Sequence, residues 1–292
     1  MIRTVVNGVS IHYDDQGPSD GIPVVLVHGH PFDRTLWAPQ VTALTAAGYR
    51  VVTPDLRGYG SSEVVPGTCL LSDFADDIAG LLDTIGLESV VIGGVSMGGQ
   101  ITMEFQRTRP ERVRGIVLSD TSPVAETEEG KAFRIALAAR LLSEGMGPYA
   151  DEVIGRMIAP YNVTALPDVA GHVLAMMRAT APEGAAAALR GRAERPDYRD
   201  TLAGTSVPVL ILVGADDDYT PVSEAQAMRR LIPSADLVVI EQAGHLPGAE
   251  QPDAFNDALL TFLGTRVTDH EQGRPAPGQG PGHPAPRHDH RL

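Results

Sequence analysis

The sequence predicts an α/β protein with a mostly parallel central sheet, an antiparallel edge, helices on both faces and an inserted helical cap. Apolar runs alternate with helical patterns along most of the chain. Several runs, such as VVLV, GIVLS and VLILV, would be apolar on both faces of a strand, which is typical of parallel strands covered on both sides. The alternation stops over residues 122–205, where an alanine-rich stretch has helical character.

Eight strand-like runs and five helical patterns make up the alternating part of the chain. The strand-like runs lie at residues 2–6, 9–14, 23–28, 49–53, 89–93, 113–119, 207–213 and 236–241. The helical patterns lie between most of them, at residues 37–47, 71–85, 99–109, 222–231 and 252–263. Asn7-Gly8 joins the first two runs and favours a two-residue hairpin, which predicts the antiparallel edge.

The domain organisation follows from these patterns. Residues 1–121 and 206–265 form the two parts of an α/β core, and residues 122–205 form a cap of four short helices separated by proline and glycine. Residues 266–292 are rich in proline, glycine and polar side chains, so we expect this segment to be disordered. Three of its histidines, His283, His288 and His290, are expected to be solvated rather than to bind a metal, and His270 lies near its start.

The composition of the chain limits the kinds of partner that it is expected to bind. The formal net charge of −14 and the sequence pI near 5.0 predict an acidic surface, which repels nucleic-acid phosphates and anionic lipid. The chain begins without a signal-peptide pattern and lacks an apolar run of bilayer length, so we expect a cytoplasmic protein. Cys69 is the only cysteine and is expected to be a small buried hydrophobe. The sequence leaves the oligomeric state open.

Residues 90–101, VVIGGVSMGGQI, bracket one serine with glycines between a strand and a helix. Gly94-x-Ser96-x-Gly98 matches the nucleophile elbow, a sharp turn that projects a serine hydroxyl from the backbone. Glycine is needed because the strand folds back on the helix, where a Cβ atom would collide. The amide of Met97, immediately after the serine, is then positioned to stabilise an oxyanion. The motif predicts that Ser96 is a nucleophile.

A serine nucleophile needs a base and a group that orients the base. His245 follows a strand on a glycine-containing loop, at the sheet edge where α/β proteins bind ligands, so we predict that it is the base. The loop after residues 207–213 offers consecutive carboxylates as the orienting acid, namely Asp216, Asp217 and Asp218. Composition does not choose among them, and Asp120, after another strand, is a further candidate.

Four motifs in order make residues 1–264 resemble the α/β-hydrolase superfamily, in its serine esterase and 3-oxoadipate enol-lactonase-like branch. They are His28-Gly29-His30-Pro31, the stretch PDLRGYGSS at 54–62, the elbow at 94–98, and Gly214–Pro221 followed by Gly244-His245-Leu246. The resemblance favours Asp217 as the acid, with Asp120 and Asp216 as alternatives. It also implies that the His30 amide is the second oxyanion donor, and Pro31 has no amide to compete.

The resemblance and the predicted serine nucleophile limit the kinds of reaction that we expect. Related dehalogenases and epoxide hydrolases usually have aspartate in place of serine, and proline iminopeptidases have HGGPG where this chain has HGHP. We therefore expect a serine hydrolase that cleaves a small carboxylic ester or lactone, without a cofactor or metal. The alternatives are a perhydrolase or haloperoxidase, a C–C bond hydrolase, and a ligand-binding signalling protein that keeps the triad. Asp55 and Arg57 are expected to be ion-paired supports of the loops.

The cap is expected to determine the substrate. Its methionines are flexible thioethers suited to irregular apolar ligands. We predict that four of them bind substrate, and they are Met146, Met157, Met176 and Met177. The cap shows no obvious basic cluster for a carboxylated substrate, because its arginines are scattered along the sequence, at Arg134, Arg140, Arg156, Arg178, Arg190 and Arg192.

Overall fold

An eight-stranded sheet runs through the computed structural model, which describes residues 1–267. The strand order is β1-β2-β4-β3-β5-β6-β7-β8, and only the β1–β2 and β2–β4 pairs are antiparallel. The predicted fold class is therefore confirmed. The strands are β1 Ile2–Val6, β2 Val9–Gln16, β3 Pro23–Val27, β4 Arg50–Pro54, β5 Val90–Val95, β6 Val113–Ser119, β7 Val209–Gly214 and β8 Asp236–Ile240.

The antiparallel edge begins at the predicted hairpin. Val6 pairs with Val9, and both turn residues, Asn7 and Gly8, have positive φ (51° and 80°). A two-residue turn with positive φ at both positions matches the right-handed twist of the strands it connects.

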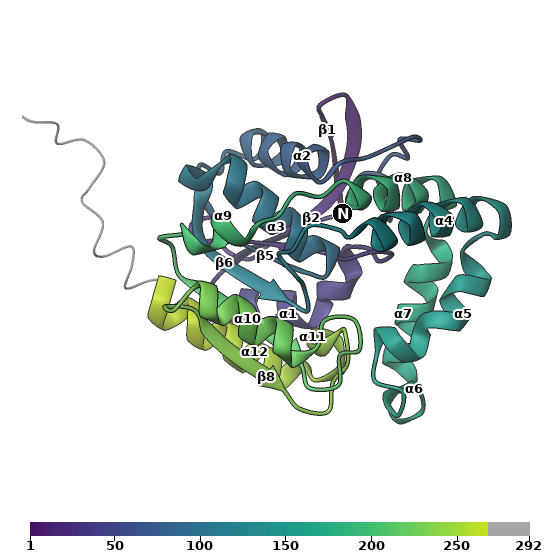
Figure 1. Cartoon of the computed structure of the whole chain (residues 1–292). Coiled ribbons are helices and arrows are strands. Elements are labelled where there is room, and N and C mark those ends of the chain that lie inside the picture. The colour runs from purple at the N-terminus through teal and green to yellow at the C-terminus, as the bar shows by residue number, and fades with distance from the viewer. Residues whose placement is uncertain (268–292) are drawn as a thin grey trace, which may run out of the picture.

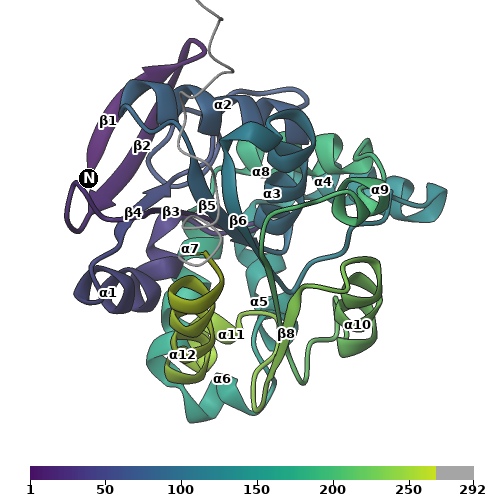
Figure 2. The same ribbon diagram turned by 90° about the vertical axis from the view of Figure 1, so that its left-hand side faces the viewer.

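Helices cover both faces of the sheet (Figures 1 and 2). Neighbouring residues of one strand face opposite sides. Val25 of β3 belongs to the apolar cluster that includes α2, α3 and α10, while Leu26 belongs to the cluster that includes α1 and α12. The helices of the core are η1 Arg34–Trp37, α1 Ala38–Ala46, α2 Leu71–Thr84, α3 Met97–Thr108, η2 Pro110–Arg112, α10 Val222–Leu231, α11 Pro247–Glu250, α12 Pro252–Phe262 and η3 Leu263–Val267. None of the helices within residues 1–267 has the length and apolar character needed to cross a bilayer.

Six helices, not four, lie between β6 and β7 (Figure 1). The two that sequence reasoning missed, α6 and α9, have four and five residues, too few to show a helical period. The six are α4 Glu128–Glu144, α5 Met146–Met157, α6 Asn162–Ala165, α7 Pro167–Ala179, α8 Pro182–Ala193 and α9 Arg199–Ala203.

The segment predicted to be disordered, residues 266–292, differs from this expectation at its first two residues. Arg266 and Val267 lie in η3, and Arg266 forms an ion pair with Asp236, so the helix continues beyond the expected boundary at residue 265. The rest of the segment predicted to be disordered, which includes His283, His288 and His290, lies outside the described residues.

The loop after β4 is held by ion pairs, as expected, but its two charged residues have separate partners. Asp55 accepts from the Arg34 guanidinium at 2.6 Å and from the amides of Arg34 and Ser61. Arg57 instead pairs with Asp77 of α2 at 2.5 Å. Since both carboxylates are buried, these contacts anchor the loop beside the sheet edge.

Candidate active site

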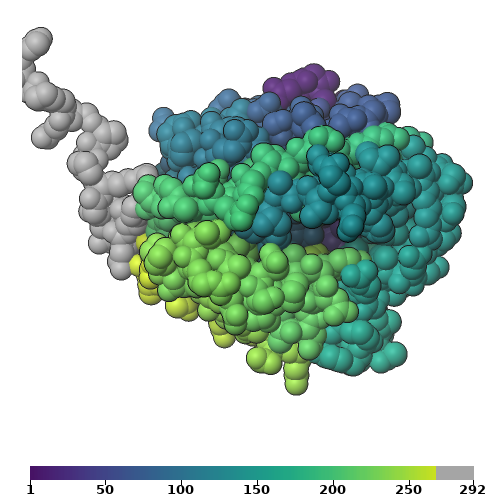
Figure 3. Space-filling model, in the orientation of Figure 1, coloured from purple at the N-terminus to yellow at the C-terminus, as the bar shows by residue number. Residues whose placement is uncertain are grey.

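A cavity of about 570 Å³ lies between the sheet edge and the cap helices, and Figure 3 shows its opening. Core loops supply four of the lining residues that matter for chemistry: His30, Ser96, Asp120 and His245. The cap supplies charged and apolar groups that include Arg134, Met157 and Arg192. The predicted nucleophile and base therefore face one enclosed space.

Ser96 occupies a strained turn between β5 and α3. Its backbone has φ 55° and ψ −116°, a region that costs a non-glycine residue about 1–3 kcal/mol. A Cβ atom at Gly94 would collide with Gly98, and one at Gly98 would collide with the carbonyl of Val27, as the elbow motif requires. The helix begins at Met97 rather than at the expected Gly99, because two glycines of low helix propensity obscure its first turn.

His245 and Asp217 are brought together from loops after β8 and β7. His245 Nδ1 lies 2.9 Å from Asp217 Oδ2, and both side chains are buried. Asp217 also accepts from the Tyr219 amide at 2.8 Å and from the Thr220 hydroxyl at 2.5 Å. Burial alone would raise the pKa of Asp217, but the charge and hydrogen bond of His245, with these two donors, lower it overall.

The neighbouring carboxylates have other environments. Asp216 and Asp218 are exposed, and Asp216 accepts a hydrogen bond from the Tyr161 hydroxyl. Asp120 is buried, where the Gly214 amide and the Ser119 hydroxyl donate to it at 2.8 and 2.5 Å. Burial and the charge of Asp217 raise the pKa of Asp120 well above its ordinary value. Asp120 thus favours its neutral form.

Within residues 1–267, one set of ligating groups is close enough to share a metal ion. It comprises Asp120, Asp217 and His245, whose ligand atoms lie within 4.8 Å of one another. His245 Nδ1 and Asp217 Oδ2 already form a hydrogen bond with each other, so those atoms satisfy one another without a metal. We assign no metal to this cluster.

His30 lines the same cavity as Ser96, and Met97 directly follows Ser96 in the chain. Met97 is the first residue of α3, and the first amides of a helix have no acceptor within it. The His30 ring is buried, with Nδ1 2.8 Å from the Tyr59 hydroxyl, and Nε2 has no partner among the described residues. Burial and the nearby charge of Arg192 lower the pKa of His30 well below its ordinary value, so its ring is neutral.

Two residues that sequence reasoning did not select hold the site loops. His28 is buried, and its Nε2 accepts from the Leu56 amide at 3.1 Å, which joins the loops after β3 and β4. Glu250 of α11 accepts from the amides of Gly244 and Ala159, both at 2.8 Å. The motif around His28 could have indicated the role of His28, but no sequence pattern indicated the role of Glu250.

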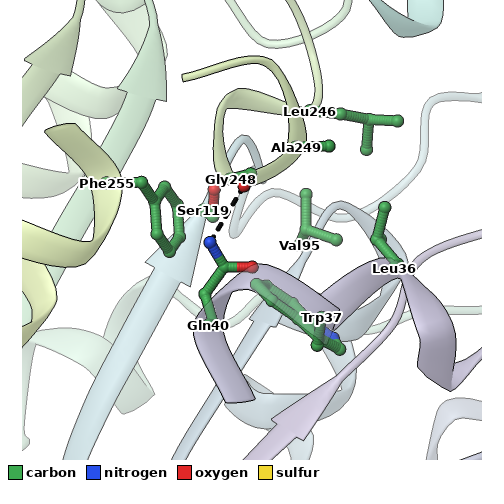
Figure 4. Close-up of a pocket in the computed structure, with 9 residues that line it drawn as sticks. All are labelled: Leu36, Trp37, Gln40, Val95, Ser119, Leu246, Gly248, Ala249 and Phe255. Carbon is green, nitrogen blue, oxygen red and sulfur yellow. Dashed lines mark hydrogen bonds between the residues drawn. The ribbon is translucent and has the colours of Figure 1, made fainter. Parts of the chain in front are cut away.

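A small cavity of about 10 Å³ lies behind the site, at the base of its loops (Figure 4). Val95, Ser119 and Leu246 line it, and each is next in sequence to a candidate site residue. Gln40 donates to the Gly248 carbonyl across it at 2.9 Å. Tight packing at this point restricts the loops that carry Ser96 and His245.

The prediction that the four cap methionines bind substrate needs correction. Met157 lines the cavity, but Met146, Met176 and Met177 do not. Those three are buried in the apolar cluster where α5 packs against α7, which explains their helical spacing.

The expectation that the cap has no basic cluster was wrong. Arg134, Arg192 and Arg195 come together in the cavity wall, beside Glu126. Arg134 and Arg195 both form ion pairs with the Glu126 carboxylate. These residues are separated by up to 69 positions in the sequence, so only the fold brings them together.

Comparison with known proteins decides the family. A model of the alpha/beta hydrolase family matches residues 24–258. This chain belongs to the alpha/beta hydrolase family. The hydrolase is 29% identical over 256 residues to 3-oxoadipate enol-lactonase 1 of Acinetobacter baylyi, covering 88% of this chain and 94% of that one. It is 31% identical over 279 residues to a non-heme chloroperoxidase of Streptomyces lividans, covering 89% and 98%.

Solved structures agree with this assignment. The hydrolase matches a thermophilic esterase from Thermogutta terrifontis with a TM-score of 0.88 and 39% identity, covering 91% of this chain and 100% of that one. It matches the enol-lactonase from Burkholderia xenovorans with a TM-score of 0.84 and 28% identity, covering 90% and 100%. The enol-lactonase-like resemblance stated from the motifs is confirmed.

Proposed function

We propose that this hydrolase cleaves a small carboxylic ester or lactone through an acyl-enzyme formed on Ser96. The observation that supports this best is the buried His245–Asp217 hydrogen bond of 2.9 Å, at a cavity that Ser96 also lines. The similarity to an esterase and to enol-lactonases supports the same substrate class.

The hydrogen bond suggests how the reaction proceeds. The Nδ1–H group of His245 donates a hydrogen bond to Asp217 and keeps its proton, which leaves Nε2 free to accept the proton of the Ser96 hydroxyl. The serine oxygen attacks the carbonyl carbon, and the amides of His30 and Met97 stabilise the negative oxygen that forms. His245 then protonates the departing alcohol. A water molecule next gives a proton to His245 and attacks the acyl-enzyme carbonyl, and His245 passes that proton to the Ser96 oxygen as the acid leaves. Asp217 stays ionised and stabilises the imidazolium.

Covalent labelling tests the nucleophile. A fluorophosphonate should add once to the wild-type protein, on Ser96, and peptide mass mapping should locate it. Ser96→Ala should remain folded, lose the adduct and lose ester hydrolysis. An adduct on another serine, or retained turnover in Ser96→Ala, would overturn the proposal.

Four aspartate variants test the acid. Asp217→Asn should lose about 10⁴-fold in turnover, because an imidazole without its carboxylate partner adopts the wrong tautomer. Asp216→Asn and Asp218→Asn, on exposed neighbours, are matched controls that should lose little. Asp120→Asn should also be mild, since its carboxylate favours the neutral form. If Asp120→Asn is the crippled variant while Asp217→Asn stays near wild type, the acid is Asp120.

A further inference from the structure

Arg192 of α8 is a buried cation that has no ion-pair partner among the described residues. Only 8% of the residue is exposed, and its guanidinium makes one hydrogen bond, from Nε to the Gln100 side-chain oxygen at 3.1 Å. The other arginines in this wall of the cavity differ, because Arg134 and Arg195 share the Glu126 carboxylate. The terminal nitrogens of Arg192 are therefore free to bind a group inside the cavity.

The ion pairs around Arg192 leave it uncompensated. Arg134 and Arg195 both use the Glu126 carboxylate, and Glu152 of the same cavity pairs with Arg140 instead. Burial and the two neighbouring arginines lower the pKa of Arg192 well below its ordinary value, which is the cost of holding an uncompensated charge there. This wall is locally positive although the whole protein has a formal net charge of −14. An anion in the cavity would offset that cost.

Arg192 also lies close to the proposed nucleophile. Its partner Gln100 is four residues after Ser96 on α3, and the Gln100 amide donates to the Ser96 carbonyl at 3.2 Å. Four residues of helix rise only about 6 Å. A ligand that reaches both groups therefore needs only a few atoms between them.

We propose that Arg192 binds a carboxylate carried by the substrate, so that the enzyme prefers esters or lactones with a carboxylate a few carbons from the scissile carbonyl. Guanidinium binds carboxylate through two parallel N–H···O bonds, and the pairing is strong where water is excluded. One unpaired guanidinium matches a monoanion better than a phosphate dianion, given that Glu126 is nearby. The inference rests on the proposed function, because it assigns the substrate class of the same site.

A matched pair of esters tests the charge preference. Monomethyl glutarate carries a carboxylate where methyl 5-methylhexanoate has an uncharged isopropyl group of similar shape. The release of acid from each should be followed by titration at constant pH. We expect the wild-type kcat/KM to be at least about 100-fold higher for the anionic ester.

Arg192→Met should remove most of this preference, because the kcat/KM for the anionic ester should fall much further than the kcat/KM for the neutral ester. Replacing an unpaired buried cation with an apolar side chain should keep the protein folded. Arg190→Met is the matched control, since Arg190 lies on the same helix but bonds the Gly67 carbonyl outside the cavity. Arg190→Met should keep the wild-type preference.

Binding without turnover gives an independent readout. Monomethyl glutarate should raise the Tm of Ser96→Ala but not that of Ser96→Ala/Arg192→Met. Equal wild-type activity on both esters, or an unchanged preference in Arg192→Met, would overturn the assignment of Arg192 while leaving the proposed function intact. Failure of the proposed function would be seen separately, as absence of the fluorophosphonate adduct on Ser96.

Discussion

Asp120 shows how a single buried residue couples stability to pH. Its pKa in the folded protein is raised well above its ordinary value of about 3.8 by burial and by the charge of Asp217. Above that ordinary value the unfolded chain loses the proton while the folded protein keeps it. Stability therefore falls as the pH rises from about 4 towards the folded pKa.

Asp120→Asn removes this titration and keeps a neutral side chain beside Asp217. We expect its Tm to gain on wild type progressively as the pH rises from about 4 towards the folded pKa of Asp120, with a change in relative unfolding free energy of at most about 1.4 kcal/mol per pH unit. Thermal unfolding of both proteins across that range measures the effect. A Tm difference that stays constant with pH would mean that Asp120 is ionised in the folded protein.

At the scale of elements, α11 joins the histidine loop to the cap through one carboxylate. Glu250 accepts from Gly244 and Leu246 on either side of His245, and from the Ala159 amide and the Asn162 side chain beyond α5. Burial raises the pKa of Glu250, although these hydrogen bonds oppose that change. The loop geometry of His245 thus depends on a residue that does not line the cavity.

Glu250→Ala leaves several buried donors without an acceptor, so we expect a loss of about 3 kcal/mol or more in unfolding free energy. Glu250→Gln keeps one oxygen and should show an intermediate loss. Both should lower kcat more than they change KM, and amide hydrogen exchange at Gly244 should become faster. Glu241→Gln, on an exposed glutamate of the same loop, is the control. Unchanged exchange at Gly244 in Glu250→Ala would show that this carboxylate does not restrain the loop.

At the scale of the whole molecule, the cap shares its apolar interior with the core. One continuous cluster contains Trp37 and Val95 of the core together with Leu137, Tyr149 and Leu189 of the cap. The side chain of Arg195, where the chain leaves α8, also binds the Val124 carbonyl and Glu126, where it enters α4. Neither part buries its apolar surface alone, which favours unfolding as one unit.

We therefore expect a single cooperative transition. Trp37, the only tryptophan, reports on the core, while far-UV circular dichroism reports on all the helices. Urea denaturation followed by both signals should give coincident midpoints. A helical signal that is lost before the Trp37 fluorescence changes would indicate that the cap unfolds independently.

The sequence by itself determined the features that depend on neighbouring residues. Continuous apolar runs predicted the parallel strands, Asn7-Gly8 predicted the hairpin, and glycine spacing predicted the turn at Ser96. Each is a local effect, because side-chain periodicity and backbone freedom act over a few positions. The one-turn helices α6 and α9 were missed for the same reason, since a single turn is too short for a helical pattern of apolar residues to repeat.

Only the tertiary structure decided which distant side chains meet. It buried Asp217 against His245 while its two neighbours stayed exposed. It buried three of the four cap methionines against neighbouring helices, and it gathered Arg134, Arg192 and Arg195 on one wall of the cavity. These outcomes depend on how loops and helices that are far apart in the chain pack together. They also depend on which polar groups become buried there without a hydrogen-bond partner. No local pattern carries that information.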